Sequence, residues 1–173
     1  MSSLRSIFAR VVLVFPFLLS TPVRGDEPKA VVRVELAGDT ALKPLTGRLF
    51  VFFSQRSGEP RFGPDWFNPE PFFAREIAAF EFGSKQILDD SADHFPQPLS
   101  QLKPGNYRVQ ALLDHDFYSA SPAHGEGNLY SEVAMLEVGD DAWTLDLKLT
   151  QAIAPRAIQE REWVRPVRYR SEL

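Results

Sequence analysis

The chain contains no cysteine among its 173 residues. This absence excludes disulfide bonds, thiolate metal sites, a cysteine nucleophile and a lipid-modified N-terminal cysteine. Histidine is scarce, with three copies, and no G-x-S-x-G sequence occurs, so the nucleophile elbow of the α/β-hydrolases is missing from this chain. The stability of the folded domain must therefore come from its hydrophobic core.

The chain also has no excess of basic residues. It carries 19 lysines and arginines against 23 aspartates and glutamates, and residues 26–173 alone carry 16 against 23, a net charge of −7. A surface of this sign repels a phosphate backbone, so we expect no nucleic-acid partner.

The first 25 residues have the pattern of a secretory signal peptide. Arg5 and Arg10 precede an apolar run over residues 11–20 that only Pro16 interrupts, and small or moderate side chains allow cleavage after Gly25. A membrane anchor is the competing interpretation, but the run is about half of the roughly 20 residues that a spanning helix needs. We therefore expect an exported protein, periplasmic or secreted, with no membrane span after cleavage. Its expected segments are a signal peptide (1–25), a β-sandwich domain (26–150) and a charged linker or edge strand (151–173).

Strand-like segments fill the middle of the chain. Several alternate apolar and polar residues, whereas Gly47–Ser54 is almost continuously apolar, as is typical of a central strand covered on both faces. The segment 72–82 fits helical and strand periodicity, and its β-rich surroundings favour a strand. Gly139 and the two aspartates after it predict a tight hairpin. The expected strands are Lys29–Ala37, Gly47–Ser54, Phe72–Phe82, Lys85–Asp89, Leu102–Asp114, Asn128–Val138 and Trp143–Leu149.

A tyrosine-corner pattern opens the strand Leu102–Asp114. Leu102, Pro104, Gly105 and Tyr107 have the spacing of a turn that delivers a tyrosine, whose hydroxyl then binds nearby backbone. Trp143 is expected to point into the core. The pattern predicts an all-β fold, an Ig-like or fibronectin-type Greek-key β-sandwich of about seven strands.

The loop over residues 55–71 is rich in proline and aromatic residues. It holds four prolines and two glycines in seventeen residues, too many for a regular element. Large rings in or beside such a loop either fill the space beneath it or wait for a partner. The candidate interface residues are Trp66, Phe67, Phe72 and Phe73. A carbohydrate-binding role would need an exposed coplanar row containing Trp66.

The loop over residues 114–127 holds the only clustered polar candidates for chemistry. Ser119 or Ser121 with His124 and Asp116 would be needed for a hydrolytic triad, but a loop of this composition predicts no scaffold to hold the geometry. We therefore expect no catalytic residues and no enzymatic activity for this chain alone.

The same region is acidic enough to raise the question of a metal ion. An irregular calcium site would use oxygens from acidic or amide side chains, although the spacing does not match an EF-hand. His115 and His124 with Asp116 give a lesser zinc alternative. We expect no metal and no cofactor; the candidates for a calcium site are Asp114, Asp116, Glu126 and Asn128.

Three stretches together resemble a known family. These are RFGPDWFNPEPFFA at Arg61–Ala74, LKPGNYRVQALLD at Leu102–Asp114 and GEGNLYSE at Gly125–Glu132. The chain is similar to the signal peptide and N-terminal Ig-like β-sandwich domain of secreted bacterial esterases of the esterase D or enterochelin-esterase type.

The resemblance implies that this chain corresponds to an accessory domain. In such esterases the serine nucleophile lies in an α/β-hydrolase domain that follows the sandwich, and no such domain occurs within these residues. The chain is then either a non-catalytic binding module, with an esterase catalytic domain or another exported protein as partner, or the leading fragment of a carboxylic-ester hydrolase.

Overall fold

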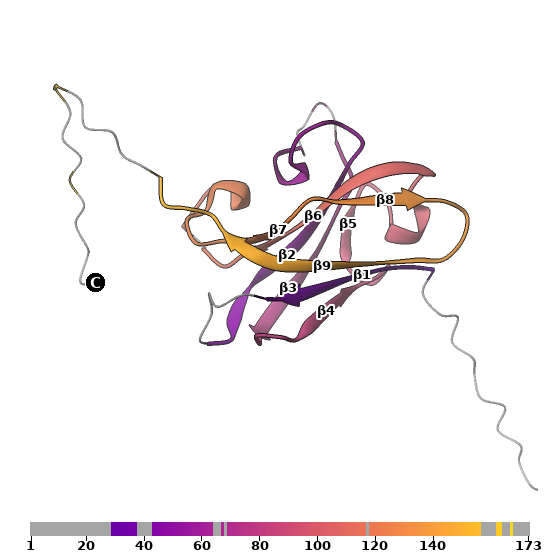
Figure 1. Cartoon of the computed structure of the whole chain (residues 1–173), viewed down its shortest axis with the longest axis horizontal. Coiled ribbons are helices and arrows are strands. Elements are labelled where there is room, and N and C mark those ends of the chain that lie inside the picture. The colour runs from indigo at the N-terminus through magenta and orange to yellow at the C-terminus, as the bar shows by residue number, and fades with distance from the viewer. Residues whose placement is uncertain are drawn as a thin grey trace, which may run out of the picture.

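The computed structural model describes residues 29–37, 43–63, 67, 69–116, 118–156, 162, 163 and 167. The expected signal peptide over residues 1–25 lies outside the described residues, as does most of the tail. The described part is all-β, as predicted (Figure 1). Its strands are Ala30–Leu36 (β1), Leu45–Ser54 (β2), Phe72–Phe80 (β3), Lys85–Leu88 (β4), Asp93–Phe95 (β5), Gly105–Asp114 (β6), Leu129–Ser131 (β7), Ala134–Val138 (β8) and Trp143–Ala152 (β9). Its short 3-10 helices are Pro60–Phe62 (η1), Leu99–Gln101 (η2) and Pro122–His124 (η3).

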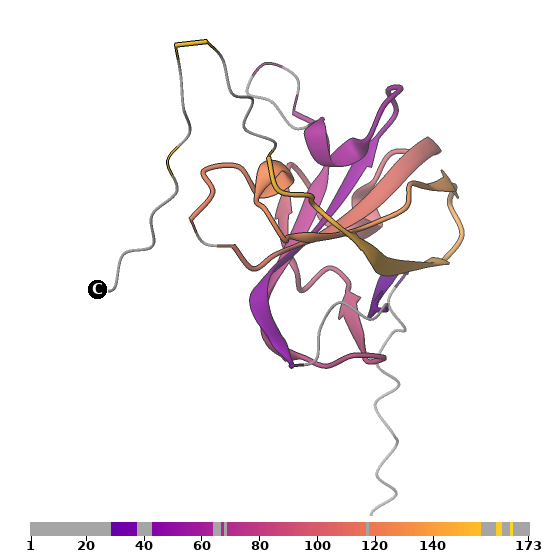
Figure 2. The ribbon, with the colours of Figure 1, turned by 60° about the vertical axis from the view of Figure 1, so that its left-hand side comes forward.

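The described strands form one curled sheet. The hydrogen-bonded order is β4-β1-β9-β7-β6-β2-β3-β5, with β8 paired to β6. The turn over residues 81–84 leads from β3 near one end of this order to β4 at the other, and the Gly83 amide donates to the Leu36 carbonyl at 2.8 Å. The two halves of the sheet therefore face each other across a common core (Figures 1 and 2). The narrower prediction of an Ig-like Greek-key sandwich stays a prediction.

The core follows from the alternation of the strands. On β2, Leu49, Val51 and Phe53 point inward and are fully buried. The Phe53 ring centroid lies 5.3 Å from that of Phe73 and 6.3 Å from that of Trp143. Trp143 thus packs against the core, in the structural role expected for it.

The tyrosine corner is present. The Tyr107 hydroxyl donates a hydrogen bond to the Lys103 carbonyl at 2.9 Å. Gly105 has a φ of +151°, a conformation that favours glycine, and Leu102 is buried while Pro104 lies on the surface. Burial raises the pKa of the Tyr107 phenol because the charged phenolate would lose its hydration.

Replacing Tyr107 by phenylalanine is expected to lower the free energy of unfolding by about 1 kcal/mol, because the ring stays and one hydrogen bond is lost. Urea unfolding of the two proteins measures the difference. Tyr118→Phe is the matched control, since Tyr118 is 99% exposed. Equal midpoints for Tyr107→Phe and the wild type would show that the hydrogen bond does not stabilise the fold.

Several boundaries differ from those predicted. The segment expected as one strand, Asn128–Val138, is divided into β7 and β8. Ser131 causes the break, because its Oγ, not its backbone, accepts the hydrogen bond from the Ala111 amide at 2.9 Å. The short edge strand β5 pairs with β3 and was not predicted. The described residues therefore form nine strands where about seven were expected.

The predicted hairpin at residues 139–141 is wrong. β8 pairs with β6, whereas β9 pairs in parallel with β1 and antiparallel with β7, so the turn crosses between the halves of the sheet. β9 also runs to Ala152, past the domain boundary expected at residue 150. The strand interpretation of the segment 72–82 is confirmed for Phe72–Phe80, which pairs with β2.

Candidate functional site

A row of phenylalanine rings lies on the outer face of β2, β3 and β5. The inward residues of β2 alternate with Phe50 and Phe52, whose rings stack with centroids 5.7 Å apart and planes 8° apart. The register places Phe72 beside Phe52 and Phe95 beside Phe72, with centroid distances of 6.3 and 5.9 Å. The aromatic row, as we call Phe50, Phe52, Phe72 and Phe95, therefore continues across three strands.

The helices η1 and η3 turn part of this row into a groove. They lie side by side over the sheet (Figures 1 and 2), and the Phe62 ring of η1 lies 5.3 Å from the His124 ring of η3. The space between the helices and the sheet is open on one side and has a volume of ≈ 350 Å³. The aromatic groove, as we call this space, is lined by Phe50, Phe52, Arg61, Phe62, Phe72, Ser121, Pro122, Ala123 and His124.

Arg61 fixes η1 to η3 and to the sheet. Its side chain is only 9% exposed, and its guanidinium carbon lies 4.3 Å from the centroid of Phe62 and 4.0 Å from that of Tyr130. Arg61 Nε donates to the Glu59 carboxylate at 2.6 Å, and Nη1 donates to the Ala123 carbonyl at 3.3 Å. The hydrogen bond from Arg61 is the main reason why the pKa of Glu59 lies below its usual value. These contacts give the groove a preformed wall.

Asn128 holds the loop that carries η3. It is fully buried, and its Oδ1 accepts hydrogen bonds from the His115 and Asp116 amides, both at 2.9 Å. Its Nδ2 donates to Asp114 Oδ1 at 2.8 Å and to the Pro122 carbonyl at 2.9 Å. Every hydrogen-bonding position of this amide is used, so Asn128 is a structural centre of the loop.

Three of the four candidates for a calcium site, Asp114, Asp116 and Asn128, are engaged in other contacts. Asp114 accepts from Asn128, Asp116 accepts from the Tyr118 amide at 3.1 Å, and Glu126 is exposed. His115 Nε2 lies 2.9 Å from the Gly127 carbonyl. Over the described ranges, no three histidine or acidic residues are grouped so as to hold a metal ion. The geometry gives the calcium and zinc alternatives no support.

Ser121 and His124 do come together. Ser121 Oγ lies 3.1 Å from His124 Nδ1, at the rim of the aromatic groove. Asp116 is turned to the Tyr118 amide, and Ser119 donates to the Ser121 carbonyl, so neither completes a triad. Among the described residues no hydrogen bond orients the His124 ring with a carboxylate, which nucleophilic catalysis of the triad type requires.

The four aromatic residues predicted as an interface have different locations. Phe72 lines the groove, Phe73 is buried in the core, and Phe67 is 93% exposed. Trp66 lies outside the described residues. Phe50, Phe52, Phe62 and Phe95 were missed, although the almost continuously apolar run Gly47–Ser54 already indicated that β2 carries apolar side chains on both faces.

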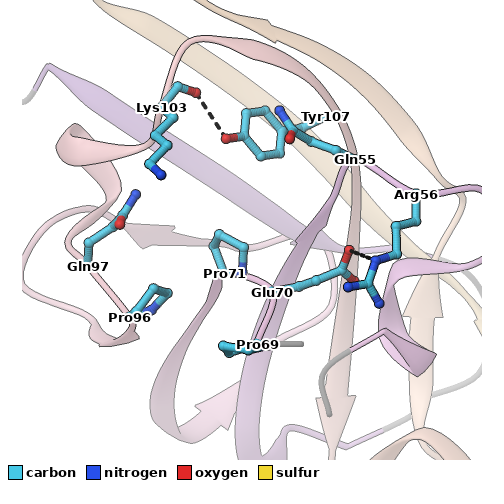
Figure 3. Close-up of a pocket in the computed structure, with 9 residues that line it drawn as sticks. All are labelled: Gln55, Arg56, Pro69, Glu70, Pro71, Pro96, Gln97, Lys103 and Tyr107. Atoms are coloured by element: carbon cyan, nitrogen blue, oxygen red, sulfur yellow. Dashed lines mark hydrogen bonds and ion pairs between the residues drawn. The ribbon is translucent and has the colours of Figure 1, made fainter. Parts of the chain in front are cut away.

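A second, polar pocket of ≈ 420 Å³ lies at the end of the sheet beside the tyrosine corner (Figure 3). Glu70 is its buried charge, and Glu70 Oε1 accepts from Ser54 Oγ at 2.7 Å and pairs with Arg56 Nε at 3.5 Å. Figure 3 shows the carboxylate turned toward Arg56, away from Lys103 and Gln97. Only Oε1 of this carboxylate is paired, and Oε2 is buried without a hydrogen-bond partner among the described residues. The pocket has no aromatic wall besides Tyr107, so it is the lesser candidate for a protein partner.

Comparisons with family models, curated proteins and solved structures found no match for this chain. Within the described ranges, no helix is long and apolar enough to cross a membrane. The candidate site therefore stands on its geometry: an aromatic groove with a fixed wall and a small polar rim.

Proposed function

We propose that this chain is an exported, non-catalytic β-sandwich module that binds another protein through the aromatic groove. The observation that carries the proposal is the groove itself, in which four phenylalanine side chains line an open space on the outer face of a sheet. Apolar surface of this kind, with a polar rim, is typical of a protein interaction site.

The fixed wall favours binding as well. Arg61 holds η1 and η3 in place through its contacts with Glu59, Phe62 and Ala123. A groove that is already formed spends little free energy on ordering its side chains when a partner enters. The proposed partner is an apolar surface of an exported protein, or of an esterase catalytic domain joined to this module.

The resemblance to secreted esterases supports the second partner. Arg61, Phe62 and Phe72 all belong to the stretch Arg61–Ala74 of that resemblance, and all three line the groove. Phe72 also lies in WFNPEPFF, the more specific element within this stretch. We therefore propose that the module is related to the N-terminal domain of such esterases and is exported with them.

The alternative is that the chain is the leading part of a serine esterase. It would be favoured by a G-x-S-x-G elbow, followed by aspartate and histidine, in the reading frame beyond Leu173. Ester hydrolysis by this chain itself would be a different finding and has its own test. Hydrolysis of short p-nitrophenyl esters that is lost in Ser121→Ala would show that the Ser121–His124 pair is catalytic.

A carbohydrate is less well matched to the groove. Phe50 and Phe52 stack on each other. A sugar needs free aromatic faces, and these two rings cover part of each other's.

The groove is expected to bind a small aromatic probe. Benzyl alcohol, titrated into the mature chain, should shift the NMR signals of groove residues, and Phe62→Ser should reduce its affinity about tenfold or more, because Phe62 is half exposed on the groove wall. Phe82→Ser is the matched control, since Phe82 is 58% exposed on the turn after β3. Shifts that are absent, or equally reduced by both substitutions, would contradict a binding role for the groove.

A further inference from the structure

Two of the large apolar features that the described chain leaves open to solvent are a groove and a single side chain. One is the aromatic groove, and the other is Trp163, whose side chain is 89% exposed. Val167, four residues later, is 80% exposed. An indole buries more apolar area than most side chains, so leaving it in water forgoes a large stabilisation. The groove offers an apolar surface, and the indole of Trp163 would be stabilised by burial against one.

The tail begins beside the groove. The Gly127 amide donates to the Ile153 carbonyl at 2.9 Å, and the Ile153 amide donates to the Asn128 carbonyl at 2.8 Å. These bonds fix the end of β9 to the loop that carries η3, and both views show the chain leaving β9 next to η3 (Figures 1 and 2). Trp163 follows Ile153 by ten residues, which can span up to about 33 Å when extended.

The charges of the two parts are complementary. Residues 26–150 hold 11 basic and 20 acidic residues, a net charge of −9, whereas residues 151–173 hold five arginines and three glutamates, a net charge of +2. Near the row, Arg48 is shared by the exposed carboxylates of Glu76 and Asp93, each at 2.8 Å, so one negative charge remains there. Arg161 and Arg165 flank Trp163 on either side. Glu160 and Glu162 balance these two arginines, so the charge complementarity is between the tail as a whole and the acidic body that carries the groove.

We infer that the aromatic groove of one copy receives Trp163 of a second copy, and that the two copies exchange their tails reciprocally. This inference rests on the proposed binding role of the groove and names its occupant. A second copy is the source because the described chain leaves its own Trp163 exposed. Reciprocal exchange closes the assembly as a two-fold dimer and leaves no open groove.

The rim suits an indole. The indole ring would enter among Phe50, Phe62 and Phe72, and its N–H needs an acceptor once the ring is buried. Ser121 Oγ and the His124 ring, which lie at the rim, supply such acceptors.

Sedimentation equilibrium of the mature chain across a wide concentration range tests the inference. We expect a monomer–dimer equilibrium that Trp163→Ala weakens at least tenfold and that Phe62→Ser weakens equally. Phe82→Ser is expected to leave it unchanged. A mixture of Trp163→Ala and Phe62→Ser should form dimers that neither variant forms alone, because one intact groove then meets one intact tail.

The outcomes separate this inference from the proposed function. Dimers lost in Phe62→Ser but kept in Trp163→Ala would overturn the tail as occupant and leave the groove as a binding site. A wild type that is monomeric throughout, or variants that do not complement each other, would also overturn tail exchange. The binding role of the groove has its own measurement, the titration with benzyl alcohol, and fails only if that titration fails.

Discussion

Replacing Asn128 by aspartate should destabilise the domain by about 3 kcal/mol or more, although the two side chains have the same shape. The substitution turns the Nδ2 donor into an oxygen, which then faces Asp114 Oδ1 and the Pro122 carbonyl at the positions where hydrogen bonds of 2.8 and 2.9 Å are now made. Two attractive contacts become repulsive ones, and one of them sets two carboxylates against each other at a fully buried position. Urea unfolding at neutral pH measures the loss.

The control for this substitution is Asn106→Asp, because Asn106 is exposed on β6. It should change the free energy of unfolding by less than about 0.5 kcal/mol.

The effect of calcium on the stability of Asn128→Asp tests the metal-site alternative. If Asp114, Asn128 and their neighbours formed a calcium site, the new carboxylate would add a ligand, and calcium would restore stability to Asn128→Asp. We expect calcium and chelators to have no effect on either protein.

The structural role of Asn128 could not be predicted from the sequence. An asparagine between acidic residues and a strand is compatible with a calcium ligand and with a strand end. What decides its role is that residues 114–116, which precede it by twelve to fourteen positions, fold back to place two free amides at its Oδ1. Loop geometry of this kind is not encoded by spacing, so the residue could be predicted as important but not for the right reason.

The strands were easier to predict because their signal is local. Alternation in Lys29–Ala37 and Trp143–Leu149 gave strands within three residues of the observed ends. The parallel pairing of β1 with β9 joins residues more than one hundred positions apart, and no turn signal can report it. The false hairpin at residues 139–141 has the same origin, since a local turn signal does not report which strand the next one pairs with.

The aromatic groove depends both on a local strand pattern and on contacts between residues far apart in the sequence. The apolar run in β2 predicted side chains on both faces, and Phe72 was among the candidate interface residues. The rings that complete the site come from η1 and η3, two short helices inside loops whose composition predicted no regular structure. Arg61 joins them through a carbonyl 62 residues away, so only the folded chain reveals the wall.

Gly47 on β2 lies against the end of β6, where the loop that carries η3 begins. Gly47→Ala should lower the free energy of unfolding by about 3 kcal/mol. A Cβ at this position would lie 2.2 Å from the Asp114 carbonyl oxygen and 3.1 Å from the His115 Cα, and both are backbone atoms that cannot rotate away. β2 or the end of β6 must shift, which disturbs the ladder between them and the residues that Asn128 binds.

Gly139→Ala is the matched control, because a Cβ there meets nothing within 4 Å, and it should be nearly neutral. Thermal unfolding compares the two, and NMR signals from residues 121–124 should move in Gly47→Ala because Asp114 begins the loop that carries η3. A stable Gly47→Ala with unchanged signals would show that β2 and β6 are not in close contact at this end, and the fixed wall of the groove would lose its anchor in the sheet.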